Sequence, residues 1–253
     1  MSDAEDGPVR VERTGPVMVI TLARPDARNS FDEPTALALR AAFDELDADD
    51  DARCGVLTGE GGFSAGLDLK AFLDEGLPRP LLELFERGTE TPLVAAVEGY
   101  ALAGGLELAL TCDLIVAGEG ARFGIPEVGV GLFAGGGGLF RLPDRIGLTR
   151  TLELALTGRP IDAARAEEIG LVSSVVPAGT AVEAARDLAA TIAGNAPLGV
   201  RSSKRIVWGS IGIGDAESWR MQEPLLDEIL SSADAVEGPS AFAEKRAPKW
   251  TGR

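Results

Sequence analysis

The sequence of 253 residues contains no histidine, and this absence removes several kinds of chemistry. Histidine is the general base of the common serine-hydrolase triad and a frequent ligand of zinc and non-haem iron. Residues 62–66, Gly-Phe-Ser-Ala-Gly, match the nucleophile elbow of serine hydrolases, but no histidine is present to activate Ser64. We therefore expect neither a serine hydrolase nor a metal centre, and proton transfer must use carboxylates, lysine, cysteine or the single Tyr100.

Cysteine is also scarce. Cys54 lies in an apolar run and Cys112 precedes Asp113, so the two do not form a Cys-x-x-Cys motif. Two cysteines are too few for a disulfide framework. We expect both to be buried free thiols, as is common for cysteine.

Long apolar runs and an excess of positive charge are missing too. No uncharged segment approaches the roughly 18 residues of a membrane helix, and the start, MSDAEDGPVR, is acidic where a signal peptide is basic. The net charge of −16 argues against non-specific binding of nucleic acid. We expect a soluble, cytoplasmic protein with a frayed acidic start and with no membrane or nucleic-acid partner.

Short apolar segments alternate with helical periodicity in the first 120 or so residues. The predicted strands are residues 9–13, 17–22, 54–58, 93–97 and 113–117. One predicted helix begins at Pro34, and two others span residues 81–88 and 104–110. Residues 14–16 are predicted to form a hairpin turn between the first two strands. Such alternation predicts an α/β fold with largely parallel strands.

The second half is predicted to be mostly helical from Gly147 onward. The predicted helices are residues 162–169, 180–193, 197–208 and 215–230, and residues 171–176 resemble a strand. No tandem repeat or long low-complexity tract separates the halves. We therefore expect a helical appendage rather than an independent domain joined by a linker.

Glu107 is the one charged residue in the predicted helix that starts at Gly104. A helix that is apolar on all sides is buried, so this carboxyl group should have a raised pKa or a specific partner. One interpretation is a structural salt bridge in the core. The other is a functional carboxylate.

Glu127 is a second isolated charge, in the apolar and glycine-rich segment 123–133. It could cap a helix that begins near Gly135. Alternatively, Glu107 and Glu127 act together as acid and base on one substrate.

Glycines open two segments that could bind a ligand through backbone N–H groups. Gly66 ends the run after the predicted strand 54–58, and Gly104 starts the helix of Glu107. Two N–H groups that converge on one oxygen would form an oxyanion hole. The alternative is that these glycines only form tight turns.

Five segments in this order resemble the enoyl-CoA hydratase/isomerase, or crotonase, superfamily over nearly the whole chain. They are Arg24-Pro25 with Asn29, FSAGLDLK (63–70), GYALAGGLELALTCD (99–113), FGIPEVGVGL (123–132) and AFAEKRAPKW (241–250). The resemblance implies an α/β crotonase fold. Stacked β-β-α units would form a spiral core over residues 1–195, and residues 196–253 would form a helical region for trimerisation.

The resemblance also implies residue roles. The N–H groups of Leu67 and Gly104 would bind the thioester oxygen of an acyl-CoA, so that Ser64 is not the reactive group. Glu107 would activate water, and Glu127 would supply a proton to the α carbon. The backbone near Gly135 would help to hold the water.

For the coenzyme A part of the substrate, the resemblance implies contacts along two backbone segments and one distant lysine. These residues are Arg28, Ser30, Ala65, Gly66, Leu67, Asp68, Leu69 and, from the chain itself or a neighbouring subunit, Lys245. Lys245 could equally be a solvated charge. Ala103 stands where many relatives have glycine, and the segment 72–80 that borders the acyl chain in relatives is short.

The expected function is therefore an enoyl-CoA hydratase that needs no cofactor and assembles as a homotrimer or homohexamer. An isomerase or a dehydratase of a specialised hydroxyacyl-CoA remains an alternative within the family. A paralogue that binds acyl-CoA without turnover is the alternative from another class.

Overall fold

The computed structural model describes residues 7–253 and contains nine strands and eleven α-helices in that range. The expected frayed start lies outside the described residues. The strands are β1 (Val9–Thr14), β2 (Val17–Leu22), β3 (Cys54–Gly59), β4 (Leu93–Val97), β5 (Tyr100–Leu102), β6 (Leu114–Gly118), β7 (Arg122–Gly124), β8 (Ile161–Asp162) and β9 (Ser174–Val176). The helices are α1 (Glu33–Ala48), α2 (Leu69–Glu75), α3 (Arg79–Arg87), α4 (Gly104–Thr111), α5 (Gly138–Ile146), α6 (Leu148–Thr157), α7 (Ala163–Glu168), α8 (Ala181–Ala193), α9 (Pro197–Gly209), α10 (Asp215–Ser231) and α11 (Ala233–Glu244), with 3-10 turns η1 (Pro25–Ala27) and η2 (Pro126–Val130).

A six-stranded sheet in the order β1-β2-β3-β4-β6-β9 is the centre of the fold. β1 and β2 form the predicted antiparallel hairpin, and every later pair in this sheet is parallel. Parallel strands are covered by helices on both faces, so β3 and β4 are almost entirely apolar and buried. The predicted α/β class with largely parallel pairing is confirmed.

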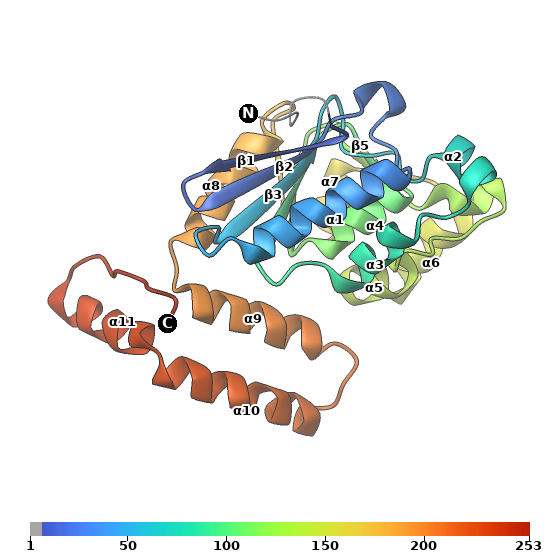
Figure 1. Cartoon of the computed structure of the whole chain (residues 1–253). Helices are drawn as coiled ribbons and strands as arrows, with labels where there is room; N and C mark the ends of the chain where they lie inside the picture. The colour runs from blue at the N-terminus through green and yellow to red at the C-terminus, as the bar shows by residue number, and fades with distance from the viewer. Residues whose placement is uncertain (1–6) are drawn as a thin grey trace.

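The two faces of this sheet pack against different cores. On one face, α8 presents Ala181, Ala185, Ala189 and Ala193, which are spaced one helical turn apart and pack with Cys54 and Val56 of β3. The other face carries the larger core, which includes side chains of α1 and α4 and the thiol of Cys112. Figure 1 shows α8 on one side of the sheet and α1 along the other.

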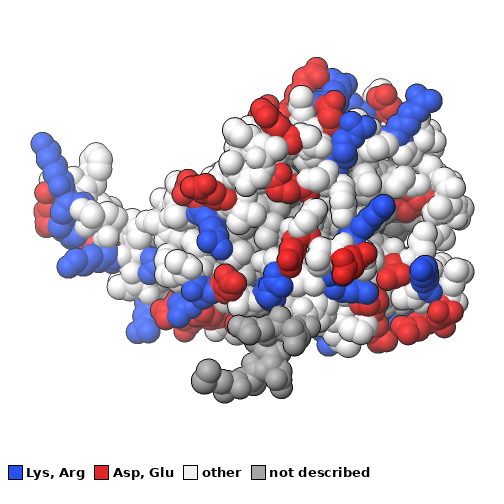
Figure 2. All heavy atoms as spheres, turned by 90° about the horizontal axis from the view of Figure 1, so that it is seen from above, with Lys and Arg blue, Asp and Glu red and all other residues white. Residues whose placement is uncertain are grey.

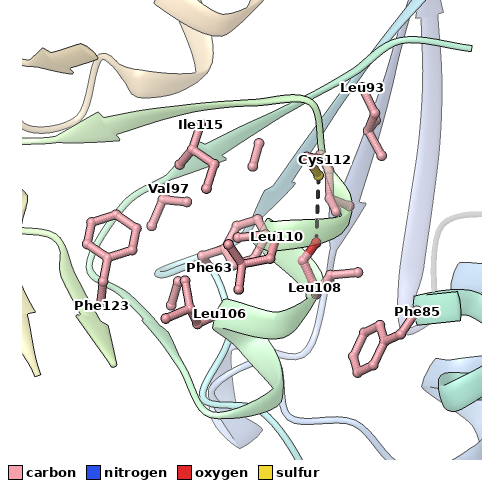
Figure 3. Packing of buried hydrophobic residues seen from close by; sticks show 14 of the residues in the cluster. Phe63, Phe85, Leu93, Val97, Leu106, Leu108, Leu110, Cys112, Ile115 and Phe123 are labelled. Atoms are coloured by element: carbon pink, nitrogen blue, oxygen red, sulfur yellow. Dashed lines mark hydrogen bonds between the residues drawn. The ribbon is translucent and has the colours of Figure 1, made fainter. Parts of the chain in front are cut away.

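Helix α4 lies inside the larger core. Its leucines Leu106, Leu108 and Leu110 point into apolar surroundings on several sides of the helix in Figure 3. A second sheet, β5-β7-β8, lies at the start of this helix: β5 leads into α4, and the N–H of Ala103 donates to the carbonyl of Gly124 at the end of β7 over 2.9 Å. This small sheet fixes where α4 begins.

Helices α9, α10 and α11 extend away from the sheet in Figure 1. Helix α9 is attached to the core through Asp113, whose carboxylate lies 2.8 Å from the ammonium group of Lys204 and accepts from Trp208 Nε1 over 2.7 Å. No helix among residues 7–253 is both long and apolar enough to cross a membrane.

The structure corrects one prediction and adds elements that were missed. The segment 171–176 is a strand only at 174–176, because Leu171 and Val172 are buried in the core without pairing in the sheet. An apolar run thus indicated burial and not extended pairing. Helix α2, which is capped by Asp68, and the small sheet were not predicted.

Charged side chains of both signs cover the face seen in Figure 2. Lysines and arginines alternate there with acidic residues, although the chain carries a net charge of −16. The acidic excess is therefore not gathered into a single patch on this face.

Candidate active site

Two loop segments lie side by side where β2 and β3 lead out of the sheet. The N–H of Ala65 donates to the carbonyl of Arg28 over 3.0 Å, and the N–H of Phe31 donates to the carbonyl of Gly66 over 2.8 Å. The structure thereby gathers most residues that were predicted to contact coenzyme A. They are Arg28, Ser30, Ala65, Gly66, Leu67, Asp68 and Leu69.

Asn29 and Ser64 join these two segments from within. Both are fully buried, and Asn29 Nδ2 donates to the carbonyls of Glu60 and Gly62 over 3.0 and 2.7 Å. Ser64 Oγ donates to the carbonyl of Asn29 over 2.8 Å and accepts from the N–H of Gly66 over 3.0 Å. The hydroxyl of Ser64 is thus committed to backbone partners inside the protein.

The backbone nitrogens of Leu67 and Gly104 lie where Gly66 and Gly104 approach each other closely. A Cβ atom on Gly66 would lie 2.6 Å from the nitrogen of Gly104, and one on Gly104 would lie 3.6 Å from the nitrogen of Leu67. Neither N–H has a hydrogen-bond acceptor among residues 7–253. Since Gly104 is the first residue of α4, the positive end of the helix dipole lies at this point.

Ala103 turns the chain into α4 with a backbone conformation that favours glycine. Its φ is 51° and its ψ is −129°. A residue with a Cβ atom is strained in such a region by roughly 1–3 kcal/mol. The surrounding structure maintains this strain at the residue that aims the N–H of Gly104.

Glu107 follows within the first turn of α4 and is only 4% exposed. Its Oε1 accepts from the N–H groups of Gly136 and Gly138 over 2.7 and 3.0 Å, whereas no described residue donates to Oε2. Burial raises the pKa of this carboxyl group, and the two N–H groups and the Arg141 guanidinium partly oppose that rise. Oε1 of Glu107 is therefore fixed by two backbone N–H groups, whereas Oε2 remains without a donor from the described residues.

The run of glycines 135–138 allows the backbone to approach the Glu107 carboxylate closely. A Cβ atom on Gly136 would lie 2.8 Å from Glu107 Oε2 and would collide with the ring of Phe85. The family resemblance implied that the backbone near Gly135 helps to hold a water molecule, and that role stays a prediction. The contacts of Gly136 and Gly138 with Glu107 were missed, although the unbroken run of glycines was the signal that could have found them.

Glu127 lies in η2, and its Oε2 is buried without a hydrogen-bond partner among the described residues. Burial raises the pKa of Glu127 to about 7, its own backbone N–H lowers it, and the charge of Glu107 raises it further. Burial is thus the main cause of the raised pKa of Glu127, and the charge of Glu107 adds to it.

Both structural alternatives for these carboxylates fail. No ion pair involves Glu107 in the described part of the chain, so it is not half of a core salt bridge. Helix α5 is capped by Gly137 and not by Glu127. Neither carboxyl group thus forms an ion pair with a described residue.

A cavity of about 200 Å³ opens beside Leu67. Phe31 and Phe72 are among its apolar lining residues, and its charged ones are Glu33, Glu75 and Arg79. In residues 7–253 no group of three acidic or cysteine side chains comes together to hold a metal ion.

Lys245 is not close to this site within the chain. It follows the end of α11, and α11 lies apart from α2 and α4 in Figure 1. The predicted phosphate contact of Lys245 would have to come from a neighbouring subunit, and it stays a prediction.

The arrangement has a definite chemical capacity. A carbonyl oxygen between the N–H groups of Leu67 and Gly104 would be stabilised as it gains negative charge. Burial raises the pKa of both carboxyl groups, and because that of Glu127 reaches about 7, Glu127 can exchange a proton near neutral pH.

Known proteins share both the sequence and the fold. The model of the family described as enoyl-CoA hydratase/isomerase matches residues 12–253. The chain is 40% identical to enoyl-CoA hydratase EchA19 of Mycobacterium tuberculosis over the full length of both proteins, and 38% identical to carnitinyl-CoA dehydratase of Salmonella typhi over 97% of this chain and 98% of that one. A crystal structure of enoyl-CoA hydratase from Mycobacterium tuberculosis H37Rv superposes with a TM-score of 0.93 at 47% identity, over 98% of this chain and 100% of the other.

Proposed function

Because the chain belongs to the enoyl-CoA hydratase/isomerase family and is a hydro-lyase, we propose that it adds water reversibly to trans-2-enoyl-CoA thioesters. The observation that carries this proposal is the pairing of two buried carboxyl groups with two free N–H groups. An isomerase needs one proton-transfer group on the substrate, whereas hydration needs a base for water and an acid for carbon.

In the proposed mechanism, the thioester oxygen lies between the N–H groups of Leu67 and Gly104. The free Oε2 of Glu107 accepts a proton from water, and the water oxygen attacks carbon 3 of the enoyl group. Electron density moves onto the thioester oxygen as an enolate, where the two N–H groups stabilise the transition state more than the substrate. Glu127 then donates its proton to carbon 2.

The pKa values support these roles. A carboxyl group with a pKa of about 7, such as Glu127, still holds its proton in a substantial fraction of molecules at neutral pH. Glu107 has two N–H donors on Oε1 that favour its ionised form. The pair can therefore carry one proton between them, which is the state that hydration requires.

A specialised dehydration is the second candidate. The relatives described as carnitinyl-CoA dehydratase are 38% identical to this chain, and dehydration is the same reaction in reverse. The charged residues Glu33 and Arg79 at the cavity beside Leu67 favour a polar acyl group over a long aliphatic one.

We also propose that the helical region, residues 196–253, serves assembly into a trimer or hexamer in the cytoplasm. The helices expose large apolar side chains that an assembly would cover. They include Val207 at 66%, Trp219 at 68%, Leu230 at 67% and Phe242 at 87% exposed. Lys245 would reach a coenzyme A phosphate from the neighbouring subunit.

The test is the loss of enoyl-thioester absorbance when the purified protein is mixed with crotonyl-CoA, and then with a 2-enoyl-CoA that carries a polar acyl end. We expect turnover that Glu107→Gln and Glu127→Gln each lower by roughly 10²- to 10⁴-fold. Full hydratase activity in Glu107→Gln would exclude the mechanism with two carboxylates. Tight binding of both thioesters without turnover would instead indicate a binding protein.

A further inference from the structure

We propose that Arg141 is a positioning residue for Glu107. It holds the glycine run whose N–H groups bind Oε1 of Glu107, and it thereby keeps Oε2 directed toward the substrate. This inference deepens the proposed function, since it concerns the carboxylate that would activate water.

The contacts of Arg141 lie on the opposite side of the same glycine. Arg141 Nη1 donates to the carbonyl of Gly136 over 3.1 Å, while the N–H of Gly136 donates to Glu107 over 2.7 Å. Arg141 Nη2 donates to the carbonyl of Phe85 in α3. One guanidinium group thus ties α5, the glycine run and α3 together beside the carboxylate.

The glycine run needs such a tie. Residues 135–138 are four consecutive glycines, and glycine has more backbone freedom than any other residue. No side chain of the run can fix the direction of its N–H groups. The carbonyl of Gly136 is held by Arg141 and the N–H of Gly138 belongs to the first residue of α5, so both donors to Glu107 are flanked by fixed points.

Arg141 also acts on Glu107 through its charge. The guanidinium lowers the pKa of Glu107, and Glu127 of η2 is a second acidic group, near enough for the charge of Glu107 to raise its pKa. Removing the guanidinium would thus loosen the donors and also favour the protonated form of the base.

The side chain of Arg141 reaches a cavity of about 560 Å³ between the core and the C-terminal helices. Thr111, Lys204 and Trp208 also line this cavity. Guanidinium added to a variant that lacks the side chain therefore tests whether a free cation in this cavity can replace it.

Arg145 provides a matched control. It lies one turn later in the same helix, is half-buried like Arg141, and donates to the carbonyls of Leu110 and Cys112 over 3.3 and 2.6 Å. It makes no hydrogen bond to the glycine run. Replacing it removes a half-buried arginine without releasing the donors of Glu107.

The experiment compares Arg141→Ala, Arg141→Lys and Arg145→Ala with the wild type, in the full chain. Hydrogen exchange of the backbone segment 135–139 is measured without substrate, and kcat, KM and the pH profile are measured with crotonyl-CoA. We expect Arg141→Ala to speed exchange in this segment, to lower kcat roughly 10- to 100-fold with KM within about threefold, and to move the acid limb of the profile to higher pH. Guanidinium in solution should restore part of kcat in Arg141→Ala. Arg141→Lys should restore the position of the acid limb more than kcat, because lysine supplies the charge without the planar set of N–H donors of a guanidinium group.

Arg145→Ala should lower thermal stability but leave the exchange of segment 135–139 and the pH profile unchanged. The inference is overturned if Arg141→Ala exchanges and turns over like the wild type, or if Arg145→Ala reproduces its changes. If Arg141→Ala does not fold, Arg141→Lys decides by the same readouts. A wild type that does not turn over crotonyl-CoA would contradict the proposed substrate. Hydrogen exchange would still test whether Arg141 holds the glycine run in place.

Discussion

Replacing Glu127 by glutamine should stabilise the protein at the same time as it removes turnover. Burial raises the pKa of this carboxyl group from 4.5 to about 7, and its Oε2 has no hydrogen-bond partner in the described structure. A raised pKa in an acid means that folding favours the protonated form. Above pH 7 the folded protein must therefore carry a buried charge that the unfolded chain carries in water.

The magnitude follows from the two pKa values. The difference between 4.5 and about 7 corresponds to about 3.4 kcal/mol, since each tenfold change in acidity corresponds to about 1.4 kcal/mol. Glu127 is only partly buried, so solvent screens part of this energy and we take about half, or about 1.5–2 kcal/mol. Below pH 4.5 both states are protonated and the difference vanishes, so glutamine gains its advantage as the pH rises from 4.5 to 7.

The assay is thermal unfolding of Glu127→Gln and wild type at pH 5 and pH 8, at one protein concentration and one scan rate. At pH 8 we expect the variant to melt about 3–8 °C higher, and at pH 5 we expect about a quarter of that gain. Glu119→Gln, at an exposed carboxylate, is the control and should shift melting by much less. A variant that melts no higher than the wild type at pH 8, or gains equally at both pH values, would refute the desolvation argument.

Three further predictions concern the rest of the site. Gly66→Ala should lower kcat roughly 10²- to 10³-fold, because the new Cβ would lie 2.6 Å from the nitrogen of Gly104, whereas Gly76→Ala, with a similar positive φ and open space around it, should keep kcat. Ser64→Ala should lower the free energy of unfolding by about 1–3 kcal/mol, measured by urea denaturation, yet retain turnover, since its hydroxyl bonds only to the backbone; a complete loss of turnover in folded protein would contradict this. The value of kcat/KM should fall as the pH rises above about 7, where Glu127 loses the proton that it donates, and a flat profile from pH 6 to 9 would argue against Glu127 as the acid.

The large sheet could be predicted because its strands are short apolar runs bounded by glycine, proline or charge. The predicted strand 93–97 coincides with β4, and the predicted 54–58 differs from β3 by one residue. Burial on both faces leaves few other residue types at these positions, so composition alone identifies them. A lone glutamate in an all-apolar helix likewise identified Glu107 as buried.

Features that depend on distant partners could not be predicted. Strand β7 is three residues long, and Phe123 is its one large apolar residue, so its sequence shows no alternation that could predict a strand. It is a strand because it pairs with β5 and β8. The positive φ of Ala103 is unusual for alanine, so it could not be predicted from the residue type. Tertiary contacts override the local preference there. The sequence shows four glycines in a row but not which N–H groups point at Glu107.

The two buried cysteines can serve as natural probes of how the two cores of the fold open. Cys54 lies in the core beneath α8 and Cys112 in the core around α4, on opposite faces of the sheet. Burial raises the pKa of both thiols to about 12, so neither supplies thiolate to an alkylating reagent at neutral pH while its core is closed. Mass spectrometry of timed alkylation would therefore report each core separately. It would reveal whether the cores on the two faces of the sheet open together or in turn, without any change to the sequence.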